Sequence, residues 1–419
     1  MFGLVDGNNF FVSCERVFDP ALEGRAVAVL SNNDGCCVSR SNEFKALGIP
    51  MGTPYFELKP LIRQYGLILR SSNYELYADM SRRIVSVLHD FAAEVEQYSI
   101  DEAFIRLADG VGTNYAEYGR RLRKTILQWV GIPCGVGFAP SMTLAKIANH
   151  IGKKSPDGVF VMPDDTRTIL EALPVSEVWG VGRRTAPKLE RLGINSAWQL
   201  AQADERLLRR HFSVLMVRTA MELRGIPVKA ALSEEEESPQ SITYSRCFGH
   251  PVTEFNDLSE SVCTYIARAA EKLRREGQKA QGVNLYFQYY PEYGERAAPG
   301  GFSSGTVMFE RPTANTGRML EQVTPRLQRL FLAGRRYKKS GIVFFGLQSA
   351  HCSQPGLFDD YERETRDERL SAAVDSINAR FGRGTLQHLA EGLEKTWSMK
   401  CERLSPRYTT DWRQLPLAH

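Results

Sequence analysis

The feature that most restricts the fold of this chain is the interleaving of short apolar segments with amphipathic helical patterns over residues 1–166. The apolar segments are short and are bounded by Gly, Asn, Asp or Pro, which favours strands at 2–5, 26–30, 98–105 and 134–138. Helical periodicity and capping residues favour helices at 41–47, 74–91, 115–130 and 141–150. Strands that alternate with helices predict an α/β layer, without requiring every strand to be parallel.

The character of the sequence changes near residue 167, where helical patterns take over. Between Arg183 and Arg224, nine basic residues stand against four acidic ones, and this local balance of +5 exceeds the +4 of the whole chain. The stretch therefore predicts a basic face. The run from Ser233 to Pro239 contains four consecutive glutamates, ends in proline and is the best candidate for a linker.

The remainder of the chain has a second mixed pattern. Strand signals at 243–250, 283–290 and 341–346 surround two helical patterns, at 258–275 and 316–331. These elements predict a compact α+β domain. Beyond residue 350 the chain is polar and irregular, with one helix expected at 370–381.

Length and composition exclude several classes of protein. A chain of 419 residues is too long for one ordinary core and should hold two to four domains. An apolar fraction of 43% and a charged fraction of 24% are typical of a soluble globular protein. The eight cysteines form no CxxC and the seven histidines show no zinc spacing, so we expect reduced thiols. No apolar run reaches the roughly 18 residues of a membrane span, and we expect a cytoplasmic protein without membrane association.

Three carboxylates interrupt the apolar segments: Asp6 ends one, and the pair Asp101-Glu102 lies within another. Carboxylates that approach one point from separate strands repel unless a cation lies among them, and oxygen ligands suit Mg²⁺ or Mn²⁺. Neighbouring residues on a regular strand face opposite sides, so Asp101 and Glu102 can share a metal only if the chain turns or bulges there. Turns and helix caps also place aspartates at such positions. Spacing alone therefore suggests a metal site without establishing one.

Three motifs resemble those of the Y-family DNA polymerases, and they occur in the family's order and spacing. The first is Asp6-Gly-Asn-Asn-Phe-Phe-Val-Ser-Cys-Glu15, and the second is Tyr98-Ser-Ile-Asp-Glu-Ala-Phe104. The third combines Gly135-Val-Gly-Phe with Leu144-Ala-Lys-Ile-Ala148. Within the family the resemblance is to the UmuC-type catalytic subunit of DNA polymerase V, whose particular signatures match at 31–35, 72–80 and 405–410.

The resemblance implies an α+β multidomain fold in the form of a right-hand polymerase. The α/β palm would comprise residues 1–18 and 73–166, and small fingers would occupy 19–72. A helical thumb with a helix-hairpin-helix would occupy 167–232, followed by a linker at 233–241. An α+β little finger at 242–349 and a C-terminal tail at 350–419, with a clamp-binding motif, would complete the chain.

The resemblance also implies roles for matching residues. Asp6, Asp101 and Glu102, with the backbone carbonyl of Gly7, would ligate two Mg²⁺ ions, with Mn²⁺ as an alternative. The incoming nucleotide would be held by Asn42, Lys45 and Lys153, although any one lysine taken alone is more often a solvated charge. Phe11 lies at the steric-gate position, where many UmuC-type chains have tyrosine, and would exclude a 2′-hydroxyl. Phe10 is placed beside it in the nucleotide site, but a core aromatic is the preferred interpretation of that residue.

Further residues would contact DNA or a partner protein. Trp179-Gly-Val-Gly182 resembles a helix-hairpin-helix turn, whose backbone N–H groups contact a phosphate. Candidate DNA contacts are Gly180, Gly182, Arg183, Arg184, Arg246, Arg335 and Arg336. For each arginine singly, a solvated surface charge is an equal alternative. Gln354, Leu357 and Phe358 resemble a short peptide that inserts into a sliding clamp.

The implied function is error-prone, template-directed DNA synthesis across lesions in the SOS response, by two-metal-ion nucleotidyl transfer. The implied partners are primer-template DNA, dNTPs, a processed UmuD-type dimer, the sliding clamp and a RecA-type recombinase. Short fingers would close loosely over a base pair, and this would explain both tolerance of damage and poor fidelity. Two alternatives stay open at this point: a DinB-type polymerase that works alone, and a non-catalytic DNA-binding or checkpoint scaffold.

Overall fold

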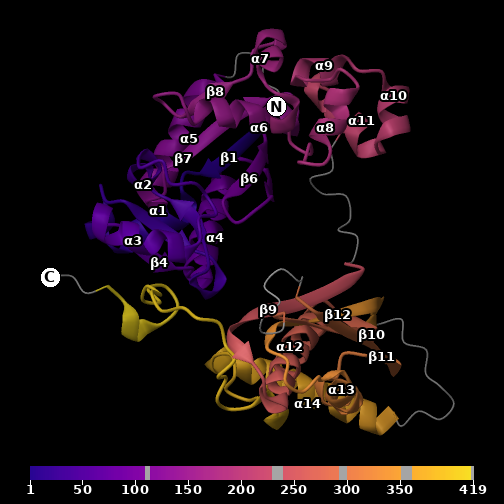
Figure 1. The fold of residues 1–419 in the computed structure, drawn as a ribbon. Coiled ribbons are helices and arrows are strands. Elements are labelled where there is room, and N and C mark those ends of the chain that lie inside the picture. Colours follow the sequence, from indigo (N-terminus) through magenta and orange to yellow (C-terminus); the bar gives the residue numbers. More distant parts are fainter. Residues whose placement is uncertain (109–113, 229–238, 292–299, 351–360, 417–419) are drawn as a thin grey trace. The chain divides into compact units, whose positions relative to one another are not determined.

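The computed structural model describes residues 1–108, 114–228, 239–291, 300–350 and 361–416. The chain forms two compact units, Met1–Glu235 with Arg403–His419, and Glu236–Glu402 (Figure 1). The stretch expected to be one C-terminal tail from residue 350 is therefore shared between the units. Its helix, α14 (Tyr361–Phe381), is longer than the segment expected at 370–381.

The first unit is built around a five-stranded sheet. In sheet order its strands are β5 (Glu94–Gln97), β6 (Glu102–Arg106), β1 (Phe2–Gly7), β7 (Cys134–Ala139) and β8 (Val159–Val161). The central strand β1 is antiparallel to both β6 and β7, and β7 is parallel to β8. The sheet is therefore mixed, which agrees with the predicted α/β layer.

Alternating side chains of β1 enter two different cores. Leu4 packs with α6 (Met142–Gly152), whereas Val5 packs with α1 (Phe10–Phe18), α4 (Tyr74–Phe91) and α5 (Tyr115–Val130). The helix α6 can lie close on β7 because residue 137 is glycine: an added Cβ there would be 2.1 Å from the backbone nitrogen of Asn149. The buried Asn149 amide donates to the carbonyls of Leu4 and Gly135, which joins α6 to both strands.

A smaller three-stranded sheet lies within residues 27–71 of the first unit. Its strands, in the order β3 (Cys37–Arg40), β2 (Val27–Leu30) and β4 (Ile68–Ser71), carry the helices α2 (Asn42–Ala46) and α3 (Tyr55–Tyr65). Two short 3-10 helices, η1 (Pro20–Leu22) and η2 (Asn32–Asp34), flank β2. Of these elements, the sequence indicated only β2 and α2. The strands β3 and β4 are four residues each, and such short elements carry little periodic signal.

Helices take over at residue 167, as the sequence predicts. The elements are α7 (Arg167–Ala172), η3 (Val175–Glu177), α8 (Ala186–Arg191), α9 (Ala197–Gln202), α10 (Glu205–His211) and α11 (Val214–Leu223). Their apolar side chains share a core with α6, and the buried carboxylate of Glu222 accepts the backbone N–H groups of Thr143 and Val228.

The second unit has a four-stranded antiparallel sheet, consistent with the expected α+β domain. Its strand order is β11 (Phe302–Thr313), β10 (Gln278–Tyr289), β12 (Tyr337–Ser349) and β9 (Ser241–Val252). The helices α12 (Phe255–Arg275) and α13 (Thr316–Leu330) share one core with this sheet. Ion pairs from Arg274 to Asp375 and from Arg318 to Asp367 hold α14 against them. No helix within the described ranges has the length and apolarity that a membrane crossing requires.

Candidate active site

The antiparallel pairing of β1 with β6 places Asp6 directly opposite Glu102. Asp6 and Leu4 are two residues apart and share a face of the sheet, so both carboxylates point toward the α6 side. The strand expected from Tyr98 begins only at Glu102, because Tyr98 and Ser99 both donate their backbone N–H to the Glu102 carbonyl and form a turn. The turn that would allow Asp101 to face the same side as Glu102 is therefore present.

The turn fixes Asp101 beside the end of β1. The Asp101 carbonyl accepts the Gly7 N–H at 2.9 Å, and the Ser99 hydroxyl donates to the Asp101 carboxylate at 2.6 Å. Ser99 Oγ also accepts the backbone N–H of Glu102 at 3.1 Å. Backbone hydrogen bonding thus places Asp6 opposite Glu102 and Asp101 beside Gly7.

Lys146 of α6 and Lys153, the residue that caps the end of this helix, face these carboxylates. Lys153 Nζ lies 2.5 Å from Asp6 Oδ2, and Lys146 Nζ lies 3.0 Å from both oxygens of Glu102. Lys153 reaches Asp6 across Gly135, where an added Cβ would be 2.8 Å from its side chain. Lys146 was not among the predicted residues, although its helix belongs to the third motif. Its ammonium lies 4.4 Å from the ring centroid of Tyr98.

The donor set suits a divalent cation. In the described part of the chain no three acidic, cysteine or histidine side chains converge on a metal position, and Asp6 and Glu102 form ion pairs with the two lysines. Burial raises the pKa of Asp6 to about 6 against the opposing effect of Lys153, and the negative charges of Glu102 and Asp101 raise it further. Three partly exposed carboxylates supply only oxygen donors, which Mg²⁺ prefers, so the donor types fit the predicted metal.

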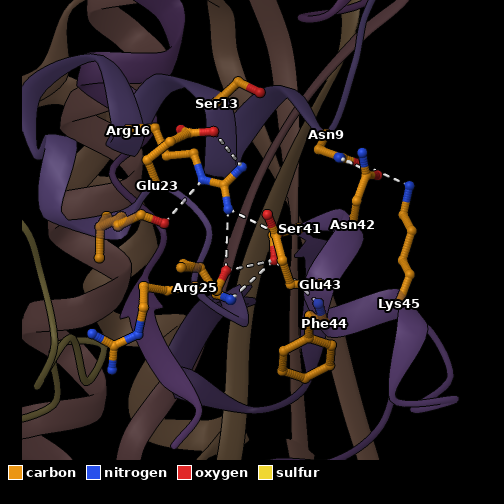
Figure 2. A network of polar contacts seen from close by, with 12 residues as sticks. Asn9, Ser13, Arg16, Glu23, Arg25, Ser41, Asn42, Glu43, Phe44 and Lys45 are labelled. Atoms are coloured by element: carbon orange, nitrogen blue, oxygen red, sulfur yellow. Dashed lines mark hydrogen bonds and ion pairs between the residues drawn. The ribbon is translucent and has the colours of Figure 1, made fainter.

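A second polar network joins α1 to α2 (Figure 2). Lys45 Nζ donates to Asn9 Oδ1 at 2.6 Å, and Asn9 Nδ2 donates to Asn42 Oδ1 at 3.0 Å. Asn9 precedes α1 with φ of 49° and ψ of 41°, a left-handed conformation that asparagine tolerates. Sequence reasoning missed Asn9, and its place just before an apolar helix was the available signal.

The helix α2 is fixed against α1 in the same network (Figure 2). Ser41, which is fully buried, caps α2 by accepting the Phe44 N–H at 3.2 Å. Arg16 of α1 donates to Glu43 at 2.9 Å and to the carbonyls of Leu22 and Arg25. Asn42 and Lys45 therefore project from a short helix whose position is set by its neighbours.

Lys45 belongs to a group of nearby cations. Burial lowers the pKa of Lys45, and the charges of Arg40 and Lys153 lower it further. The Nη1 of Arg40 donates to the Ile49 carbonyl, while its buried Nε has no hydrogen-bond partner among the described residues. Clustered cations and an unsatisfied buried donor favour binding of a polyanion. Arg40 was missed from the sequence because strand β3, which carries it, was not recognised.

The resemblance implies a triphosphate contact at Lys45, so we expect Lys45→Ala to reduce kcat/KM for dNTP insertion by about 10- to 100-fold. A hydrogen bond from a charged group contributes about 1.5–3 kcal/mol. Steady-state single-nucleotide insertion measures the effect. Lys59→Ala, at an exposed position of α3, is the matched control and should insert nucleotides like the unaltered chain. Equal kinetics for the two variants would contradict a triphosphate contact at Lys45.

Phe10 and Phe11 are placed differently. Phe10 is 3% exposed and lies in the core, so its side chain is not a nucleotide-binding surface and the core interpretation is the better one. Phe11 is partly exposed and stacks on Tyr77, with ring centroids 4.4 Å apart and planes at 13°. Tyr74 contacts Phe11 edge-on at 5.9 Å. Two aromatic rings thus hold Phe11 near the start of α1.

Asp6, Glu102 and the two lysines line a cleft with a volume of about 810 Å³. Its walls come from β1, β6, α6 and the segment 168–179. Residues that line it include Asp6, Glu102, Lys146, His150, Lys153 and Trp179.

The predicted DNA contacts divide between the two units. Gly180 has a φ of 95°, which a turn before α8 requires, and the neighbouring Arg183 and Arg184 are exposed. Arg246, Arg335 and Arg336 belong to the second unit, where each lies over a tyrosine ring. Gln354, Leu357 and Phe358 lie outside the described residues.

The fold is that of the Y-family DNA polymerases. A solved Y-family DNA polymerase chimera, Dbh-Dpo4(243-245)-Dbh, aligns with a TM-score of 0.61 at 21% identity and covers 83% of this chain and 100% of its own. Family models match as the impB/mucB/samB family over 5–150, the IMS family HHH motif over 163–194 and the impB/mucB/samB C-terminal domain over 239–357. Residues 368–418 match a domain of unknown function (DUF4113).

Curated relatives agree over nearly the whole chain. Protein UmuC of Salmonella typhimurium (strain LT2) is 41% identical over 99% of both chains, and protein ImpB of Salmonella typhimurium is 40% identical over 100% of this chain and 99% of its own. DNA polymerase IV of Desulfatibacillum aliphaticivorans is 28% identical over 92% of this chain and 95% of its own. The chain belongs to the impB/mucB/samB family, as a UmuC-type translesion polymerase that synthesises DNA on a DNA template.

Proposed function

We propose that nucleotidyl transfer takes place at Asp6, Asp101 and Glu102, which hold two Mg²⁺ ions with help from the Gly7 carbonyl. The observation that carries this proposal is the antiparallel register of Asp6 with Glu102, together with the hydrogen bond from Gly7 to the Asp101 carbonyl. Bound metal ions stabilise the attacking and leaving oxygens of an in-line displacement. Divalent-metal dependence is general in this polymerase family, and Mn²⁺ suits the same ligands.

The nucleotide is bound, in this proposal, by the cations and amides around Lys45. Asn42, Lys45 and Lys153 contact the triphosphate, and Arg40 adds its unsatisfied Nε. Their charge offsets the negative charge that develops as pyrophosphate leaves. Phe11 lies under the sugar, where a flat ring leaves no room for a 2′-hydroxyl.

We assign the palm to 1–18 and 73–166, the fingers to 19–72, the thumb to 167–232 and the little finger to 242–349. The thumb and the little finger would bind the DNA backbone. The turn at Gly180 and Gly182, with Arg183 and Arg184, contacts backbone phosphates in a sequence-independent manner. In the little finger, Arg246, Arg335 and Arg336 do the same. The polymerase would act in the cytoplasm during the SOS response.

Primer extension past an abasic site in Mg²⁺ tests this function directly. The chain is assayed alone and together with a processed UmuD-type dimer, the sliding clamp and a RecA-type recombinase. We expect extension past the lesion, stimulated by these partners. Extension that stops at the lesion under every condition, with normal synthesis on undamaged template, would contradict bypass by this chain.

The clamp contact is tested by replacing both Leu357 and Phe358 with alanine. We expect the double variant to lose capture by the immobilised clamp, since apolar side chains that enter a pocket dominate such contacts. A variant with Pro355→Ala keeps both apolar side chains and serves as the matched control. Undiminished capture of the double variant would show that Gln354–Phe358 does not bind the sliding clamp.

A further inference from the structure

The last segment of the chain returns to the first unit as a short strap, which we define as residues 403–408. Its backbone pairs with the end of β4: Ser71 donates its N–H to the Arg403 carbonyl at 3.0 Å, and the Arg403 N–H donates to Ser71 Oγ at 2.9 Å. The Arg403 guanidinium donates to Tyr55 Oη at 2.7 Å and lies 4.6 Å from the centroid of that ring. It also lies 3.5 Å from Asp34. Arg403 therefore joins the strap to the layer of the small sheet.

Ser405 joins the strap to α1 and α4. This serine is 6% exposed, donates its hydroxyl to Glu15 Oε1 at 3.0 Å and accepts from Asn73 Nδ2 at 3.0 Å. Asn73 is the N-cap of α4, since its side-chain oxygen accepts the Leu76 N–H at 3.3 Å. The strap thus contributes a hydroxyl to a buried polar cluster at the beginning of α4.

The same cluster leads to the predicted steric gate. Glu15 is 1% exposed, and burial raises the pKa of its carboxyl, while hydrogen bonds from Tyr77 and Ser405 lower it. The Tyr77 hydroxyl donates to Glu15 Oε1 at 2.7 Å, and the Tyr77 ring is the one on which Phe11 stacks. Ser405, Glu15, Tyr77 and Phe11 therefore form a continuous line of contacts from the strap to the gate.

A second stacking contact reinforces this line. Tyr408 of the strap stacks on Phe18, at the end of α1, with ring centroids 4.9 Å apart and planes at 8°. The strap therefore contacts α1 at Glu15 and at Phe18, one turn apart, while Phe11 lies at its beginning. The strap thus contacts α1 at two points, besides the core in which that helix is packed.

We propose that the strap is a positioning element for Phe11 and thereby sets the selectivity between deoxyribonucleotides and ribonucleotides. Ser405 and Tyr77 both donate a hydrogen bond to Glu15 Oε1. Without the Ser405 hydroxyl, Glu15 loses one of these two donors, and the contact that connects Tyr77 to the strap through Glu15 is broken. Phe11 then rests on a ring with more freedom to shift. The inference depends on the gate function proposed for Phe11, and it gives a role to the end of the domain of unknown function matched at 368–418.

Sugar discrimination by the full-length chain, assayed alone and with the partner proteins of the primer-extension experiment, tests the inference. The quantity measured is the ratio of kcat/KM for a dNTP to that for the matching rNTP on undamaged primer-template. We expect Ser405→Ala to lower this ratio about tenfold. We expect the same effect from Tyr77→Phe, which removes the hydroxyl and keeps the ring. Because both changes interrupt one line of contacts, the double variant should be no worse than the poorer single variant.

Controls separate a positioning role from general stability. Arg413→Ala alters an 89% exposed side chain beyond the strap and should leave the ratio unchanged. A Ser405→Ala variant with a lower Tm and an unaltered ratio would overturn the inference. If Ser405→Ala does not fold, Tyr77→Phe is measured in its place. A lower dNTP/rNTP ratio in that variant supports the inference, and an unaltered ratio overturns it. An unaltered ratio in Phe11→Ala would instead show that Phe11 is not the steric gate, and this result would contradict the proposed function of Phe11.

Discussion

Asp101→Asn should abolish primer extension, with a fall in rate of at least about 10³-fold, because metal ligation stabilises transition-state charge by several kcal/mol. The change keeps the size of the side chain and an oxygen that can accept the 2.6 Å hydrogen bond from Ser99. It removes the negative charge, so the turn stays in place while the ligand set loses a carboxylate. The measurement is single-turnover nucleotide insertion in Mg²⁺.

The matched control for this substitution is Asp90→Asn, at an exposed position near the end of α4. It should extend primers like the unaltered chain. Fluorescence anisotropy with primer-template should show that Asp101→Asn still binds DNA, so that lost activity reflects chemistry. Extension by Asp101→Asn within a few-fold of the control would exclude Asp101 as a metal ligand.

Phe11→Ala should increase ribonucleotide insertion relative to deoxyribonucleotide insertion by about 10²-fold. A pocket that merely contacts the sugar discriminates weakly against an added hydroxyl, so selectivity of this kind depends on a steric clash, which alanine removes. Phe11 is held by stacking on Tyr77 and by the edge of Tyr74, and it therefore cannot turn aside to admit the hydroxyl. Insertion of matched dNTP and rNTP by the same preparation measures the effect.

Phe56→Ala provides the control for loss of an aromatic side chain, since Phe56 is 71% exposed on α3. Its sugar discrimination should equal that of the unaltered chain. A Phe11→Ala variant that inserts deoxyribonucleotides normally and still rejects ribonucleotides would show that another residue forms the gate. Phe11→Tyr, which restores the residue common in UmuC-type chains, should retain full discrimination.

The sequence by itself indicated three strands of the main sheet and the helices α4, α5 and α6, and it predicted the three carboxylates as a site through the resemblance of their motifs. Short apolar segments over 2–5 and 134–138 indicated two strands of the main sheet, and both strands are buried along nearly their whole length. The motif around Asp101 also raised a geometric requirement for a turn. The backbone hydrogen bonds of Tyr98 and Ser99 meet that requirement.

Only the tertiary structure decided which residues surround those carboxylates and the predicted phosphate ligand Lys45. Lys146, Arg40 and Asn9 join the site from separate elements, and their spacing along the chain carries no signal of that proximity. The strap is the clearest case: Ser405 and Glu15 are 390 residues apart and share a hydrogen bond in the core of the first unit. Local periodicity reports which face of an element is buried. It cannot report which distant segment covers that face, since that depends on the packing of the whole chain.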